Sequence, residues 1–385
     1  MIKKASIAQF LFCIVLCYII APWFFERKFL VNEMLVASGI CLLAYKRFKL
    51  PNDVISRNIL LLLAWCLIHA ATSLFRADSA YYYFRNLVIV YSVLTYFIGY
   101  FLFPYLRNFI TKFRQPLQFY IGLFIFIPLP RLFFERFGVS ALFPSLLQKT
   151  SNKLLLPILI ILNVVYAISY KSSTTFMLAM FYLLLLITPG YRFFKQFLFV
   201  ILGSFAAFFI IIQPNLEIIS IHYDYYNTVA IHEVMSSNPI LSIDGNSTWR
   251  LVLWKEVIVD HFPVNIFGLG FGTPMIKYFP VEDYSKISSL PYVLGAHNSF
   301  VYLFGRLGIV YLVLMAVIYR TIFKEYFFYK AYYYSHKSIL VFWSFFAITI
   351  VALFNPVLES PIFSGVYWLI LGLLARCVVK RKQEI

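Results

Sequence analysis

Apolar runs about as long as a membrane-spanning helix recur along this chain and set the strongest limit on its fold. The core of a bilayer is crossed by a helix of about 20 consecutive apolar residues. Within 385 residues the eleven clear runs lie near 6–25, 29–45, 58–75, 86–104, 117–134, 154–170, 174–189, 193–213, 298–319, 338–355 and 360–379. Because polar backbone groups in lipid must be hydrogen-bonded within their own segment, these runs predict helices. We expect an all-α polytopic membrane protein.

The charge composition points to the same class. Only 13% of the residues are charged, whereas soluble domains contain about 25%. The net charge of +17 comes from basic residues gathered in short loops, which is typical of cytoplasmic loops and argues against a nucleic-acid partner. Part of the excess could also serve an anionic, lipid-linked substrate. The five cysteines have neither a disulfide pattern nor metal-ligand spacing. No metal site is expected, and no cofactor is expected either.

Basic clusters also predict the orientation of the chain. Lys3 and Arg381 belong to clusters at the two ends, which places both termini inside the cell. An even number of crossings is then required, and residues 117–153, where prolines and charges interrupt an apolar stretch, could hold one further short or broken segment. We therefore expect about 12 transmembrane helices, 11 of them clear, with residues 214–296 on the outside.

Residues 214–296 form the only extended polar region. They divide one integral membrane domain into an N-terminal transmembrane bundle at 1–213, a large extracytoplasmic (periplasmic) loop at 214–296 and C-terminal transmembrane helices at 297–385. A loop of this length is usually functional or disordered. Its aromatic and apolar content argues against disorder.

Within this loop, residues 246–260 predict an amphipathic helix lying on the outer membrane surface. Its apolar face comprises Leu251, Trp254, Val257 and Ile258. Arg250 lies in the first turn, where the helix dipole disfavours a cation. We therefore expect an anionic partner for Arg250, although an arginine that reaches phospholipid headgroups is an equal alternative.

Polar residues at the start of the next apolar run are candidates for chemistry. His297 carries an imidazole that can move a proton near neutral pH, and Asn298 follows it; an ordinary helix cap is the alternative for His297. Arg306 lies nine residues further on, about 13 Å deeper by helical rise, and a charge at that depth is functional by default. Glu359, between the last two runs, could pair with an arginine of the site or face solvent.

Taken in order, these segments resemble the bacterial O-antigen ligase and O-antigen polymerase superfamily. The residues that carry the resemblance are Arg250 with Trp254, then Pro263 with Gly268-Leu269-Gly270-Phe271-Gly272, then His297-Asn298 with Gly308. The segment Ser73–Asp78 also resembles the short outer loop that this family has after its third span.

The resemblance implies a membrane-embedded glycosyltransferase in the bacterial inner (plasma) membrane, with its site facing the periplasm. It implies a metal-independent reaction on a glycan linked to a polyprenyl diphosphate such as undecaprenyl diphosphate. His297 would then be the general base and Arg250 the clamp on the diphosphate. Attack opposite the leaving group would invert the anomeric centre. The expected substrate-binding residues are Arg306, Asn298, Lys171, Trp254 and Glu359.

The choice between polymerase and ligase depends on a mid-chain position. The family usually carries an arginine at the start of a mid-chain span, whereas the matching stretch here, Lys171–Phe176, has none, although Lys171 could substitute. Because ligases depend on that cation, this favours an O-antigen polymerase over a ligase that transfers the glycan to lipid A core. Expected partners are the lipid-linked oligosaccharide, a glycan or lipid A core acceptor, membrane lipids, and chain-length regulator and flippase proteins.

A lipid-linked oligosaccharide transporter or flippase is the alternative from another class. It would need many spans and basic residues as well. It also predicts internal repeats with broken helices in matched positions, and no repeat is visible in the sequence.

Overall fold

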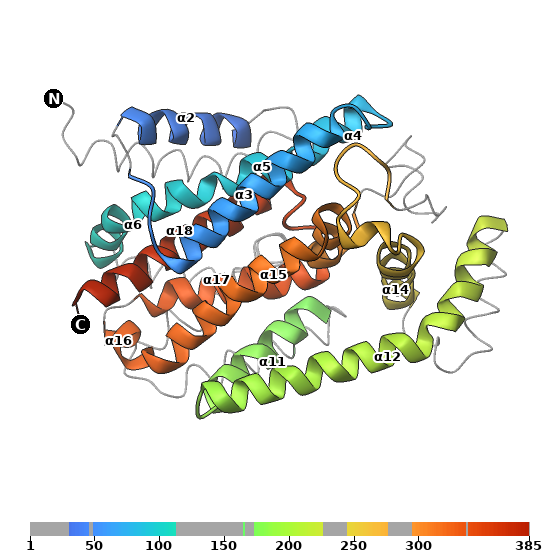
Figure 1. Ribbon diagram of the computed structural model, residues 1–385. Helices are drawn as coiled ribbons and strands as arrows, with labels where there is room; N and C mark the ends of the chain where they lie inside the picture. Colours follow the sequence, from blue (N-terminus) through green and yellow to red (C-terminus); the bar gives the residue numbers. More distant parts are fainter. Residues whose placement is uncertain are drawn as a thin grey trace. The chain divides into compact units, whose positions relative to one another are not determined.

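Helices account for all regular structure in the described part of the chain. The computed structural model describes residues 31–45, 49–112, 165, 173–225, 245–275, 295–335 and 338–384 (Figure 1). The α-helices are α2 (Val31–Tyr45), α3 (Val54–Ser73), α4 (Ala80–Asn86), α5 (Val88–Val93), α6 (Thr95–Lys112), α11 (Ser173–Ile187), α12 (Tyr191–Tyr225), α14 (Gly245–Lys255), α15 (Ser299–Phe328), α16 (Lys330–Ser335), α17 (Ile339–Phe354) and α18 (Pro361–Glu384). A π-helical turn η2 (Glu256–Asp260) and a 3-10 turn η3 (Val264–Ile266) follow α14.

Several of these helices are suited to a bilayer. Among the described residues, five stretches are long and apolar enough to cross a membrane: Val54–Ser73, Ala80–Pro104, Tyr191–Pro214, Ser299–Phe328 and Phe363–Glu384. The prediction of a helical membrane protein is therefore confirmed. The number of about 12 spans stays a prediction, because the runs near 6–25 and 117–134, most of 154–170 and the interrupted region 117–153 lie outside the described residues.

Two predicted runs differ in detail from the helices that they form. The run at 86–104 is divided between α5 and α6, which meet at Leu94. The run at 193–213 lies within α12, which continues through Pro214 to Tyr225. The backbone of α12 thus stays helical for about three turns beyond the end of the predicted run, since helical hydrogen bonds do not depend on an apolar surface.

The chain forms two compact units, each assembled from separate segments. Unit 1 comprises Met1–Leu63, Val88–Thr188 and Val317–Ile385, and unit 2 comprises Ala64–Leu87 and Pro189–Ala316. This grouping cuts across the expected boundaries after residues 213 and 296. Helix packing rather than chain order decides it, since α3 and α15 each contribute one part to either unit.

Unit 1 is built on a close approach of α6 and α18, which lie side by side in Figure 1. A Cβ atom on Gly99 would lie 2.0 Å from the carbonyl oxygen of Leu369, and one on Gly372 would lie 1.9 Å from that of Tyr96. Between the same two helices, the Thr95 hydroxyl donates to the carbonyl of Gly365 at 2.9 Å. Small residues that let backbones touch are typical of helix pairs in membranes.

We expect Gly99→Ala to destabilise the protein, because the added methyl group meets a backbone carbonyl that cannot move aside. Overpacking of this kind costs about 1–3 kcal/mol. The matched control is Gly203→Ala in α12, where a Cβ meets nothing within 4 Å. The thermal unfolding midpoint of the detergent-solubilised protein should fall for Gly99→Ala alone, and an unchanged midpoint would contradict the close α6–α18 contact.

Candidate functional site

The helix predicted over residues 246–260 is present, as α14 continued by the π-helical turn η2. Its predicted face is buried at Leu251, Trp254 and Val257, but Val252 and Leu253 are buried as well. The helix is therefore packed on more than one side inside unit 2, which corrects the expectation of a single apolar face; its place at the membrane surface stays a prediction. The periodicity identified one buried face of the helix and missed the neighbouring apolar residues Val252 and Leu253, which are also buried.

Trp254 fixes α14 beside the chain that enters α15. Its indole Nε1 donates a hydrogen bond to the carbonyl oxygen of Ala296 at 2.8 Å. Its ring packs against Phe205 of α12, with 5.9 Å between centroids. Because the indole N–H already has this partner, Trp254 positions the residue after Ala296, which is His297.

His297 lies next to the charge of Arg250, one helical turn before Trp254 on α14. Burial, and after it the positive charge of Arg250, together lower the pKa of His297 to about 4. The imidazole is therefore neutral at neutral pH and holds a lone pair that can accept a proton. The backbone of His297 is left-handed, with φ of 49°, a conformation that histidine adopts more readily than most residues.

Asn298, not His297, caps the helix that follows. Its side-chain oxygen accepts hydrogen bonds from the backbone N–H groups of Phe300 at 3.0 Å and Val301 at 3.2 Å. This is the geometry of an N-cap. The capping role that the sequence left open for His297 thus belongs to its neighbour, and the Asn298 oxygen is occupied by the start of α15.

Helix α15 is broken at Gly308, nine residues after its first turn begins. Gly308 has φ of 70° and ψ of −163° inside an otherwise helical segment. Three carbonyl groups before the break accept hydrogen bonds from elsewhere in unit 2: Gly305 from Leu269 N at 2.8 Å, Arg306 from Gly270 N at 3.0 Å and Leu307 from Trp65 Nε1 at 2.6 Å. Protein groups therefore satisfy these three carbonyls, which is the condition for irregular backbone at membrane depth.

Arg306 holds the glycine-rich turn against this break. Its side chain donates from Nη1 to the carbonyl oxygens of Gly270 at 3.1 Å and Thr273 at 2.6 Å. The guanidinium carbon lies 5.1 Å from the ring centroid of Tyr302, and the residue is 3% exposed. Among the described residues no carboxylate pairs with Arg306, so carbonyl dipoles and an aromatic ring surround its charge. The structure thus gives the predicted substrate-binding Arg306 a positioning role.

Two residues that the sequence did not single out as site residues anchor the same turn. Ser73 Oγ accepts a hydrogen bond from the backbone N–H of Phe271 at 2.8 Å, and Asn86 Oδ1 accepts one from Gly272 at 3.1 Å. A Cβ on Gly270, where φ is 75°, would lie 2.3 Å from Ser73 Oγ. Ser73 begins the segment noted for its resemblance to an outer loop, whereas nothing in the sequence distinguishes Asn86.

Unit 2 therefore contains five of the seven predicted site residues: Arg250, Trp254, His297, Asn298 and Arg306. Glu359 belongs to unit 1, in the turn between α17 and α18. Lys171 lies outside the described residues. No group of three histidine, cysteine or acidic side chains that could hold a metal ion occurs in the described ranges.

Comparison with known proteins gives no match: no family model, no curated protein and no solved structure is similar to this chain.

Proposed function

We propose that this protein is a membrane glycosyltransferase of the polysaccharide-polymerase type, acting at the outer face of a bacterial inner membrane. It would move a glycan from a polyprenyl diphosphate carrier to a hydroxyl group of an acceptor sugar. One observation carries the proposal: a half-buried, neutral His297 lies within the electrostatic reach of Arg250 at the mouth of a membrane helix. This pairs a proton acceptor with an anion-binding group.

The reaction requires one bond to form and one to break. The acceptor oxygen attacks the anomeric carbon of the donor sugar, and the bond from that carbon to the diphosphate oxygen breaks. His297 takes the hydroxyl proton, while Arg250 stabilises the charge that develops on the departing diphosphate. Attack from the side opposite the diphosphate inverts the anomeric centre. The steps proposed here do not involve a metal ion. Lys171 remains a candidate for a second cation.

Substrate binding would also adjust the base. The charge of Arg250 helps to hold the pKa of His297 near 4, which makes the free imidazole a weak base. A diphosphate bound at Arg250 would offset that charge and raise the pKa of His297 toward neutral pH, where a general base is most effective. The imidazole would then become a better proton acceptor when the donor is in place.

One observation favours a transporter of lipid-linked oligosaccharides as the second candidate. Transporters place substrate sites at the ends of broken membrane helices, and α15 is broken at Gly308. In this protein, however, backbone and indole N–H groups occupy the carbonyls that the break releases. This argues that the break shapes the protein around His297 and supports the enzyme over the transporter.

Deleting the gene and analysing the surface polysaccharide tests the proposal. We expect the deletion strain to carry single repeat units in place of polymer on a lipopolysaccharide gel, with polymer restored by the wild-type gene. Full polymer stranded on the carrier lipid would instead indicate a ligase that serves lipid A core. Carrier-linked repeats trapped on the cytoplasmic side would indicate a transporter, and unchanged polysaccharide would overturn all three.

A further inference from the structure

A second charged site lies in unit 1, where α3 begins and α18 ends. An open cavity of about 310 Å³ is lined by Asn52, Asp53, Val54, Arg57, Val379, Lys382 and Gln383. Both helices belong to candidate membrane spans. The cavity therefore opens at the level where a span leaves the bilayer. We propose that it binds the phosphate of an anionic lipid headgroup, with Arg57 and Lys382 as the phosphate ligands.

The acidic residue of the cavity is already committed to the fold. Both carboxylate oxygens of Asp53 accept hydrogen bonds from Ser56, one from its backbone N–H at 3.0 Å and one from its hydroxyl at 2.6 Å. This is the N-cap of α3. Asp53 therefore serves the helix start, and among the described residues no carboxylate lies within ion-pair distance of Arg57.

The arginine of the cavity is held in place by a neutral group. Arg57 Nε donates to the side-chain oxygen of Asn52 at 2.8 Å. This contact uses one edge of the guanidinium and fixes its direction, while the two terminal nitrogens stay available to a ligand. A planar fork of this kind suits two oxygens of one phosphate.

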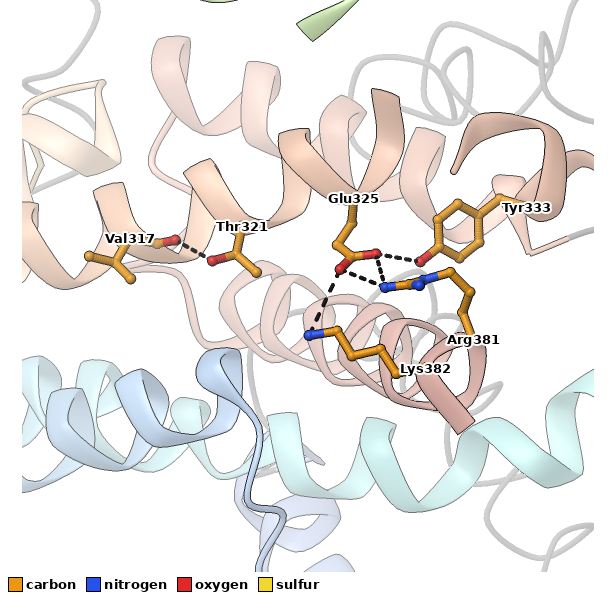
Figure 2. Close-up of polar contacts among 6 residues, drawn as sticks. All are labelled: Val317, Thr321, Glu325, Tyr333, Arg381 and Lys382. Atoms are coloured by element: carbon orange, nitrogen blue, oxygen red, sulfur yellow. Dashed lines mark hydrogen bonds and ion pairs between the residues drawn. The ribbon is translucent and has the colours of Figure 1, made fainter. Parts of the chain in front are cut away.

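The lysine of the cavity shares a single carboxylate with a neighbouring arginine, so one of the two positive charges is not balanced. Figure 2 shows Arg381 and Lys382 of α18 reaching Glu325 of α15. Arg381 Nη2 is 2.8 Å from Glu325 Oε2, and Tyr333 donates to that same oxygen at 3.3 Å. Lys382 Nζ is 3.9 Å from the carboxylate and half exposed. Since one carboxylate balances one of the two cations, Lys382 brings a net positive charge to the cavity.

The apolar part of the cavity lining favours a lipid over a free ion. Val54 and Val379 place apolar surface next to the two cations, which suits the glycerol and first methylene groups of a phospholipid. A volume of about 310 Å³ is at the lower end for ligand pockets, so it suits a headgroup rather than a whole lipid. Basic pockets between membrane helices are known to take anionic headgroups.

Lipid retention by the full-length protein tests this site. The protein would be reconstituted in nanodiscs of phosphatidylcholine with phosphatidylglycerol, and its affinity for phosphatidylglycerol measured for Arg57→Gln and Lys382→Gln. We expect each substitution to weaken binding about fivefold, from the loss of one basic contact. The matched controls are Arg192→Gln and Lys195→Gln, which remove exposed cations at the start of α12 and should leave the affinity unchanged.

Three outcomes would overturn the proposal. Equal weakening by the α12 controls would show a general attraction to the anionic surface. Unchanged affinity in both cavity variants would show that the lipid binds elsewhere. The third outcome is binding of inorganic phosphate to the protein in pure phosphatidylcholine nanodiscs. If Arg57→Gln abolished that binding and phosphate displaced no phosphatidylglycerol, the site would serve the free ion. Because the readout is lipid binding, each result is independent of glycan transfer.

Discussion

Replacing His297 with asparagine is expected to abolish polymer formation while the protein still folds and inserts. Asparagine is chosen because it accepts the left-handed backbone at this position, where φ is 49°, better than alanine or glutamine does. It cannot take a proton at neutral pH. Loss of a general base lowers a rate by about 100-fold or more, so polymer on a lipopolysaccharide gel should fall below detection.

Two controls separate lost chemistry from lost structure. The variant should match wild type in membrane protein level and thermal unfolding midpoint, since the side chain of Asn298 rather than that of His297 caps α15. Arg250→Lys should keep part of the activity, because it retains the charge that a diphosphate requires but not the planar donors. Normal polymer made by His297→Asn at normal protein level would remove His297 from the mechanism.

The membrane helices could be predicted from the sequence because lipid imposes a simple rule on them. A long apolar run has no alternative to the helix in a bilayer, so every predicted run within the described residues coincides with helical structure. The ends were less predictable. The helix that begins at Tyr191 continues to Tyr225, because a change in polarity marks where a helix leaves lipid and not where its hydrogen bonds end.

The candidate residues could be named from the sequence, whereas the contacts that they make could not. Arg250 and His297 could be paired because they belong to one ordered set of segments that resembles a known family. Which of two adjacent polar residues caps α15 depends on backbone angles that side-chain identity does not reveal. The partners of Arg306 could not be predicted for a different reason. They are the carbonyl groups of Gly270 and Thr273, and every residue has a backbone carbonyl whatever its type.

The break in α15 illustrates the same limit, because glycine is common in membrane helices and only some of these positions bend the chain. At Gly308 the backbone has φ of 70° and ψ of −163°, a region that is essentially restricted to glycine. A Cβ there would lie 2.3 Å from the carbonyl oxygen of Ile266. The glycine-rich turn thus comes so close to α15 that neither Gly268 nor Gly308 can carry a side chain.

Gly308→Ala should therefore be among the most damaging single substitutions in unit 2. The backbone conformation alone would cost about 1–3 kcal/mol, and the contact with Ile266 adds to it. If the helix straightened to relieve the strain, the carbonyls of Gly305, Arg306 and Leu307 would turn back into the helix and leave Leu269 N, Gly270 N and Trp65 Nε1 without their acceptors. Either response displaces the turn that Arg306 holds.

The expected result of Gly308→Ala is a lower unfolding midpoint together with lost polymer, in contrast to His297→Asn, which should lose polymer alone. Gly190→Ala is the matched control, since a Cβ at that non-helical glycine meets nothing within 4 Å. Limited proteolysis should show new cleavage in residues 268–273, because the turn would no longer be hydrogen-bonded to α15. A Gly308→Ala protein with wild-type stability and polymer would show that neither stability nor polymer formation requires the broken helix. It would also contradict the positioning role of Arg306.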